Sequence, residues 1–111
     1  MVLNIKHLKY SYRSENENLI EAIIQNYKTG EVVSLFYMNE DAVKKSLETG
    51  YVYRYSRKKR KVVMKGEESG NRMKIMEMIA DCDYDSLLVK VIPEGPACHL
   101  GKESCFDVQI K

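Results

Sequence analysis

The chain has 111 residues, of which 44% are hydrophobic and 31% charged, as expected for a single globular domain over residues 1–111. Its net charge of +2 is too small to indicate nucleic-acid binding, and no apolar run approaches the ~20 residues that span a membrane. The first residues lack the long apolar stretch of a signal peptide, so we expect a cytoplasmic protein.

The first half of the chain predicts a loop, a hairpin and a helix. Residues 13–18 are expected to form a loop after a short first strand. Two apolar runs, 19–27 and 32–38, flank a Gly-containing turn, which is typical of a β-hairpin. Asn39 is a suitable N-cap, and the following helix would end at residues 49–50. Within it, residues at helical spacing are Ala42, Val43, Ser46 and Leu47.

The second half predicts a series of short strands. Apolar or alternating runs indicate strands near residues 51–55, 62–64, 73–79, 86–92 and 106–110, and residues 65–71 form a loop with two glycines. One helix among seven or eight strands predicts a mostly β (α+β), barrel-like domain.

Three carboxylates stand at alternate positions, at Asp81, Asp83 and Asp85. In a straight strand the Asp81 and Asp85 backbones would lie about 13 Å apart, so one shared cation requires the segment to curl. Carboxylates about 5 Å apart repel each other, and a bound hard cation such as Mg²⁺ would make the electrostatic energy of the cluster favourable. The alternative is a solvated acidic turn without a cation, and the three aspartates taken by themselves favour this alternative.

All three cysteines, Cys82, Cys98 and Cys105, fall in one short stretch, and their odd number excludes a closed set of disulfides. Three thiolates would occupy three of the four positions of a tetrahedral zinc site and leave the fourth open for water. Three small buried hydrophobic residues are an equal alternative. His99 is either a general acid or base or a surface histidine.

Residues 57–61 are five consecutive basic residues, which predict a solvated surface or a phosphate-binding segment. In the loop at 65–71, glycines and small polar side chains would let backbone N–H groups approach a phosphate. The candidate substrate- or phosphate-binding residues are Arg57, Lys59, Lys65, Ser69 and Asn71.

In this order the motifs resemble the phosphoribosyl-AMP cyclohydrolase family of histidine biosynthesis, from about residue 19 to residue 106. The most specific segments are Asp81-Cys82-Asp83-Tyr84-Asp85, Gly95-Pro96-Ala97-Cys98-His99 and Ser104-Cys105-Phe106. The resemblance implies hydrolytic opening of the adenine ring of 1-(5-phosphoribosyl)-AMP between N1 and C6, which gives the formimino-AICAR ribonucleotide. It implies Zn²⁺ on the three cysteines, Mg²⁺ on the three aspartates and proton transfer by His99.

The resemblance also implies a β pseudobarrel with one capping helix. The family forms a homodimer whose zinc site takes its first cysteine from one subunit and the other two from its partner. Four single positions depart from the usual family pattern, at Tyr55, Val63, Glu68 and Met73, and the pair Lys58-Lys59 stands where the family has Ser-Arg. Two alternatives follow: a diverged enzyme acting on another purine nucleotide, and a non-catalytic zinc-stapled dimer that binds a nucleotide through residues 57–61.

Overall fold

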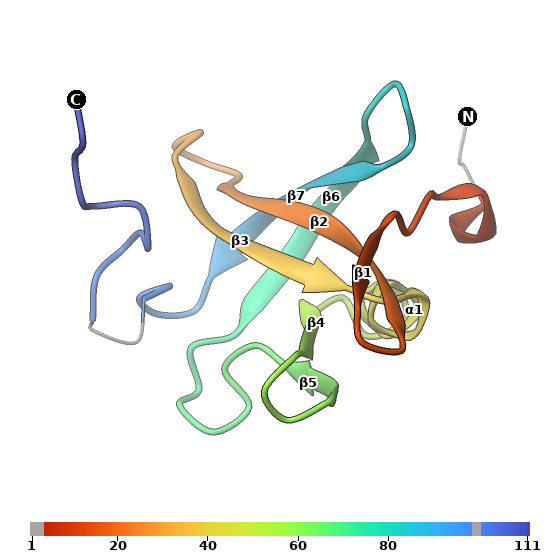
Figure 1. Ribbon diagram of the computed structural model, residues 1–111. Helices are drawn as coiled ribbons and strands as arrows, with labels where there is room; N and C mark the ends of the chain where they lie inside the picture. Colours follow the sequence, from red (N-terminus) through yellow and green to blue (C-terminus); the bar gives the residue numbers. More distant parts are fainter. Residues whose placement is uncertain (1–3, 99–100) are drawn as a thin grey trace.

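The protein is described by a computed structural model, which covers residues 4–98 and 101–111 (Figure 1). One α-helix and seven strands in these ranges confirm a mostly β domain. In chain order the elements are the 3₁₀ helix η1 (Ile5–His7), β1 (Tyr12–Ser14), β2 (Glu17–Asn26), β3 (Val32–Met38), α1 (Glu40–Thr49), β4 (Tyr53–Ser56), β5 (Lys61–Met64), β6 (Met73–Ala80) and β7 (Ser86–Pro93).

The strands form a five-stranded sheet and a separate two-stranded sheet of β4 and β5. In the larger sheet β2 pairs with β1, β3 and β7, and β7 also pairs with β6. The antiparallel β2–β3 pair confirms the predicted hairpin. The β2–β7 pair is parallel and joins distant parts of the chain. Closure of these sheets into a barrel stays a prediction.

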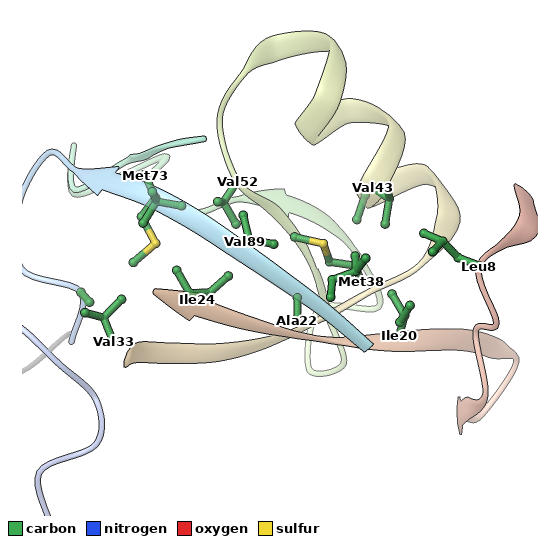
Figure 2. Packing of buried hydrophobic residues seen from close by; sticks show 14 residues of the cluster. Leu8, Ile20, Ala22, Ile24, Val33, Met38, Val43, Val52, Met73 and Val89 are labelled. Carbon is green, nitrogen blue, oxygen red and sulfur yellow. The ribbon is translucent and has the colours of Figure 1, made fainter. Parts of the chain in front are cut away.

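The hydrophobic core lies between one face of the larger sheet and α1 (Figure 2). Ile20, Ala22 and Ile24 of β2 are buried, and Val89 and Val91 of β7 follow the same alternation. Because strand side chains alternate between the two faces of a sheet, these residues share one face. Burial of an Ile or Val side chain contributes about 1.5–3 kcal/mol, which fixes the register of both strands.

Helix α1 begins and ends where the sequence predicts. The Asn39 side-chain oxygen accepts the backbone N–H of Ala42 at 2.8 Å, and Gly50 ends the helix with a φ of 79°. Ala42, Val43 and Ser46 of the helical pattern are buried, whereas Leu47 is 51% exposed. One residue step rotates a helical side chain by about 100°, and α1 packs through a stripe too narrow to include Leu47. No helix in the described ranges is long and apolar enough to cross a membrane.

Two expectations were wrong. Residues 13–18 are not a loop but the β1–β2 hairpin, whose tight turn places Glu15 at a φ of 52°. Residues 106–110 alternate in sequence but form no strand, and Val108 and Ile110 are almost fully exposed. An alternating segment becomes a strand only where a neighbouring strand satisfies its backbone groups. The strand predicted over 51–55 is shifted to β4, and Tyr51 forms an isolated bridge with Lys74.

Candidate functional site

The turn between β6 and β7 gathers the three carboxylates of the acidic motif. Oxygen atoms from Asp81, Asp83 and Asp85 lie within 4.8 Å of one another. The turn is closed by the Asp81 carboxylate, which accepts the backbone N–H groups of Asp85 at 3.0 Å and Ser86 at 3.2 Å. Tyr84 completes the curl with a φ of 61°. The segment therefore has the curl that a shared cation requires, and its all-oxygen donor set suits a hard ion.

The pKa values of Asp81 and Asp85 are shifted in opposite directions. The pKa of Asp85 is raised, first by its hydrogen bond with the Asp81 carboxyl and then by desolvation and by the charges of Asp81 and Asp83. Desolvation pushes the pKa of Asp81 upward, but hydrogen bonds from the Asp85 carboxyl and from backbone N–H groups lower it overall. A carboxyl whose pKa is raised binds its proton more tightly, and a divalent cation at the cluster would compete with that proton.

Cys98 and Cys105 lie near the same lysine. Cys98 is 8% exposed, and its backbone N–H donates to the carbonyl of Lys102 at 3.0 Å. Cys105 is exposed, and its N–H donates to the carbonyl of Val33 in β3 at 2.8 Å. Negative charge on either sulfur would raise the pKa of Lys65, so both thiols lie within electrostatic range of its ammonium group. Two thiolates in one region are soft ligands suited to zinc.

Cys82 is distant from this pair. It lies in the β6–β7 turn, which precedes β7, and it is exposed. Val33, which anchors Cys105, lies nearly level with Lys90 of β7. Ser86 is the first residue of β7 after the Cys82 turn, and Val33 lies about 13 Å from it along the strand direction and about 10 Å across the sheet. In Figure 1 the β6–β7 turn and the C-terminal segment lie on opposite sides of the molecule. Because zinc binds thiolates at about 2.3 Å, the three cysteines of one chain cannot share one ion.

A hollow of about 430 Å³ opens beside Cys105. Lys59, Lys65 and Ser69 line it, so three of the candidate phosphate-binding residues face the same space as a candidate zinc ligand. Burial lowers the pKa of Lys65, the charge of Arg54 acts in the same direction, and the cysteine sulfurs oppose both. The volume falls in the range of small-molecule sites, about 300–1,000 Å³.

A second hollow adjoins the first and shares Phe36, Arg54 and Lys59 with it. Arg54 comes from β4, and its guanidinium carbon lies 5.8 Å from the Phe36 ring centroid. This arginine was not a sequence candidate, because one basic residue within a strand forms no motif. Its position between the hollows makes it a candidate for holding an anionic group that spans both.

Arg57 lines the second hollow but is already engaged within the chain. Its guanidinium carbon lies 4.5 Å from the Tyr37 ring centroid, and one of its N–H groups donates to the Tyr12 hydroxyl at 3.2 Å. Arg60, in the same turn, pairs with Glu15 at 3.1 Å. The N-terminal hairpin therefore holds the basic residues 57–61 in place. Neither of the two interpretations of this segment, a solvated surface or a phosphate-binding segment, predicted these contacts.

Asn71 holds the loop at 65–71 beside the first hollow. Its carbonyl accepts from the Lys65 ammonium at 3.4 Å, and its backbone N–H donates to the Ser69 hydroxyl at 3.1 Å. A Cβ on Gly95 would lie 2.1 Å from the Asn71 side-chain oxygen, so the carboxamide packs directly against that glycine. The contacts of Asn71 are thus structural, and substrate binding by its side chain stays a prediction.

We expect Gly66→Ala to destabilise the protein more than Gly70→Ala. Both glycines have a φ near +80°, so both variants carry the left-handed penalty of about 1–2 kcal/mol. Only at residue 66 would the new Cβ meet backbone, 2.3 Å from the Asn71 carbonyl carbon, which adds about 1–3 kcal/mol of overpacking. Free energies of unfolding from urea titrations measure the difference, and equal losses would show that the loop yields without cost.

The four departures from the family pattern have different surroundings. Tyr55 lines the second hollow, and Val63 and Glu68 line the first. Met73 is 1% exposed in the core, so it is part of the packing and not of the hollows. His99, the candidate proton-transfer residue, lies outside the described residues.

Comparison with known sequences places the chain among proteins of one family. The sequence pattern of the phosphoribosyl-AMP cyclohydrolase family matches residues 34–107. A protein of Listeria innocua named phosphoribosyl-AMP cyclohydrolase is 47% identical over 96 residues, which are 86% of this chain and 91% of that protein.

Similar proteins also include longer ones, named histidine biosynthesis bifunctional protein HisIE. That of Caldanaerobacter subterraneus is 46% identical over 105 residues, 95% of this chain and 49% of its own length. That of Pyrococcus furiosus is 50% identical over 92 residues, 83% of this chain and 44% of its own length. The chain spans about half the length of these bifunctional relatives and most of the Listeria protein. On the strength of the matched segment and these identities, the chain belongs to the phosphoribosyl-AMP cyclohydrolase family.

Proposed function

We propose that this chain catalyses the third step of histidine biosynthesis. It would hydrolyse the N1–C6 bond of the adenine ring of 1-(5-phosphoribosyl)-AMP and release the formimino-AICAR ribonucleotide. Family membership supports this reaction. The observation that carries it is the hollow in which Lys59, Lys65 and Ser69 lie beside Cys105, because it joins groups for binding phosphate to a ligand for zinc.

We propose that Cys82, Cys98 and Cys105 hold Zn²⁺, with Cys82 supplied by a second copy of the chain. The separation of Cys82 from the other two thiols supports this assignment. When bound, zinc supplies a water whose pKa is lowered toward 7, which makes it a nucleophile at neutral pH. A reducing compartment such as the cytoplasm would keep the three thiols available to the metal.

The side chains around the hollow would bind and orient the substrate. The substrate carries two phosphates, and Lys59, Lys65 and Arg54 provide cations at the two adjoining hollows. The carboxylates of Asp81, Asp83 and Asp85 would hold Mg²⁺, which would cancel the repulsion among them. Because these aspartates flank Cys82, the second copy that supplies Cys82 would also bring its Mg²⁺ toward the phosphates. Arg57, already stacked on Tyr37, would present its charge at the second hollow.

His99 is the proposed general acid and base. Attack of water at C6 places negative charge on the ring nitrogen, and cleavage of N1–C6 requires a proton at N1. His99 follows Cys98, one of the proposed zinc ligands, in the sequence. An imidazole near neutral pH can accept the proton of the attacking water and return it to the leaving nitrogen.

The test compares the two histidines of the chain. With zinc, Mg²⁺ and phosphoribosyl-AMP, we expect His99→Ala to lower kcat by about 10²–10⁴-fold, while zinc content stays unchanged. His7→Ala, an exposed position in η1, is the control and should retain full turnover. Zinc bound by the wild type without any turnover would contradict the proposal and favour a non-catalytic zinc-stapled dimer. Turnover of another purine nucleotide alone would indicate a changed substrate.

A further inference from the structure

The two hollows differ in the charge of their linings. Two carboxylates, those of Glu67 and Glu68, line the first hollow together with its cations. The described residues that line the second hollow include no carboxylate and four cations, which are Arg54, Arg57, Lys58 and Lys59. Because carboxylates repel a phosphate while Arg and Lys side chains attract it, the second hollow is the better place for a phosphate group.

Arg57 is the cation of the second hollow that other side chains hold most closely. It lies in the exposed turn between β4 and β5. Its guanidinium carbon lies 4.5 Å from the ring centroid of Tyr37 in β3 and 5.9 Å from that of Tyr12 in β1. The two rings lie against each other, with their centroids 4.7 Å apart. The guanidinium therefore packs against a pair of tyrosines that come from two different strands.

The Tyr12 hydroxyl gives the guanidinium a fixed direction. It accepts one N–H of Arg57 at 3.2 Å. A cation–π contact alone lets the guanidinium turn above the ring, whereas an added hydrogen bond fixes its orientation. Because a guanidinium carries five N–H donors in one rigid plane, a single bond to Tyr12 aligns the whole fork and leaves donors for an anion.

The hairpin of β1 and β2 contacts the second hollow and its basic turn at more than one residue. Ser14 of β1 lines the hollow, and Glu15 pairs with Arg60 at 3.1 Å. Within the described ranges β1 is an edge strand that pairs with β2 alone, and its Tyr12 side chain is 38% exposed. The family pattern begins only at residue 34. The hairpin thus contributes little to the core, and its side chains are placed to organise the second hollow.

We propose that Tyr12 is a positioning residue, which holds Arg57 so that its guanidinium binds a phosphate of the substrate in the second hollow. The inference rests on the proposed function, which supplies a substrate with two phosphates. An arginine whose orientation is already fixed loses less conformational entropy when the phosphate binds. Since Tyr12 acts on binding and not on ring opening, its loss should raise KM and leave kcat unchanged.

The test removes only the hydroxyl of Tyr12. Tyr12→Phe keeps the ring, which is the cross-strand partner of the buried Leu19. In the zinc-loaded protein it should raise KM for phosphoribosyl-AMP about three- to tenfold, while kcat, zinc content and the thermal midpoint stay unchanged. Tyr51→Phe is the matched control, because Tyr51 also stacks with an arginine, Arg72 at 4.7 Å, and its hydroxyl also forms a hydrogen bond, with Glu94 at 3.2 Å. Tyr51 is not among the described residues that line the two hollows, so the control should keep the wild-type KM.

A double variant shows whether Tyr12 acts through Arg57. Arg57→Gln should raise KM more than Tyr12→Phe does, and adding Tyr12→Phe to Arg57→Gln should have no further effect. A role of Tyr12 in the fold alone would not depend on residue 57. An unchanged KM in Tyr12→Phe, or an equal rise with and without Arg57, would overturn the inference and leave the cyclohydrolase activity standing.

A binding measurement separates this outcome from failure of the proposed function. Calorimetric titration with ribose 5-phosphate needs no turnover, and Tyr12→Phe should bind this phosphate ester about three- to tenfold more weakly than Tyr51→Phe and the wild type do. If the zinc-loaded wild type did not turn over phosphoribosyl-AMP, the proposed function would fail. The titration alone would then decide the role of Tyr12, and equal or absent binding in the three proteins would overturn it.

Discussion

Replacing Cys82 with serine should abolish turnover and strongly weaken zinc binding while the protein stays folded. Cys82 is exposed in a turn and contributes nothing to the core, so circular dichroism and the urea midpoint should stay close to those of the wild type. The remaining two cysteines would hold zinc weakly. Changes outside the ligand shell already cost about 10–100-fold in metal affinity, and loss of a ligand should exceed that. Zinc content after gel filtration and the rate of ring opening measure the effect.

Mixing variants shows whether two chains share the site. Cys82→Ser and Cys98→Ser should each be inactive alone, because neither homodimer contains a complete set of ligands. After refolding together, half of the dimers would be mixed, and each would have one complete site of its two, which restores about a quarter of wild-type activity. If mixing restored no activity, although mass spectrometry of labelled chains showed that the copies had exchanged, the ligands would not be shared as proposed.

Local chemistry explains which parts of the fold were predictable. The hairpin and α1 follow from signals between near neighbours: two apolar runs around a Gly-containing turn over 19–38, the Asn39 cap and the left-handed Gly50. The parallel β2–β7 pair depends on residues more than 60 positions apart, and no local pattern encodes such a contact. The exposed end at 106–110 was misassigned because its alternation describes how a strand would pair, not whether a partner is available.

In the candidate site, too, features set by near neighbours in the sequence were predictable and features set by distant contacts were not. Asp81 and Asp85 are only four positions apart, so a curl of the chain suffices to bring their carboxylates together, and the oxygen atoms of the three aspartates do lie within 4.8 Å of one another. The distance between Cys82 and the other thiols was not derivable from spacing, since it is set by the length and position of β7. Arg54 was missed because its importance comes from β4 placing it between two hollows.

The acidic turn gives the second large expected effect: Asp85→Asn should weaken Mg²⁺ binding by at least about tenfold. The substitution keeps the shape of the side chain and the backbone N–H that Asp81 accepts, so the turn itself should persist. It removes one negative charge from a cluster within 4.8 Å, which relieves repulsion in the metal-free protein. The variant should therefore be at least as stable as the wild type without Mg²⁺ and gain less stability when Mg²⁺ is added.

Thermal unfolding with and without Mg²⁺ separates the cation site from the solvated acidic turn. Asp41→Asn, in the first turn of α1, removes the same charge from an exposed position outside the cluster and should leave the Mg²⁺ response unchanged. If the wild-type midpoint did not rise with Mg²⁺, or if Asp85→Asn and Asp41→Asn responded alike, the cluster would be a solvated turn. In that case the two phosphates of the substrate would depend on the cationic side chains of the hollows, and replacing Arg54 or Lys59 should raise KM without changing zinc content.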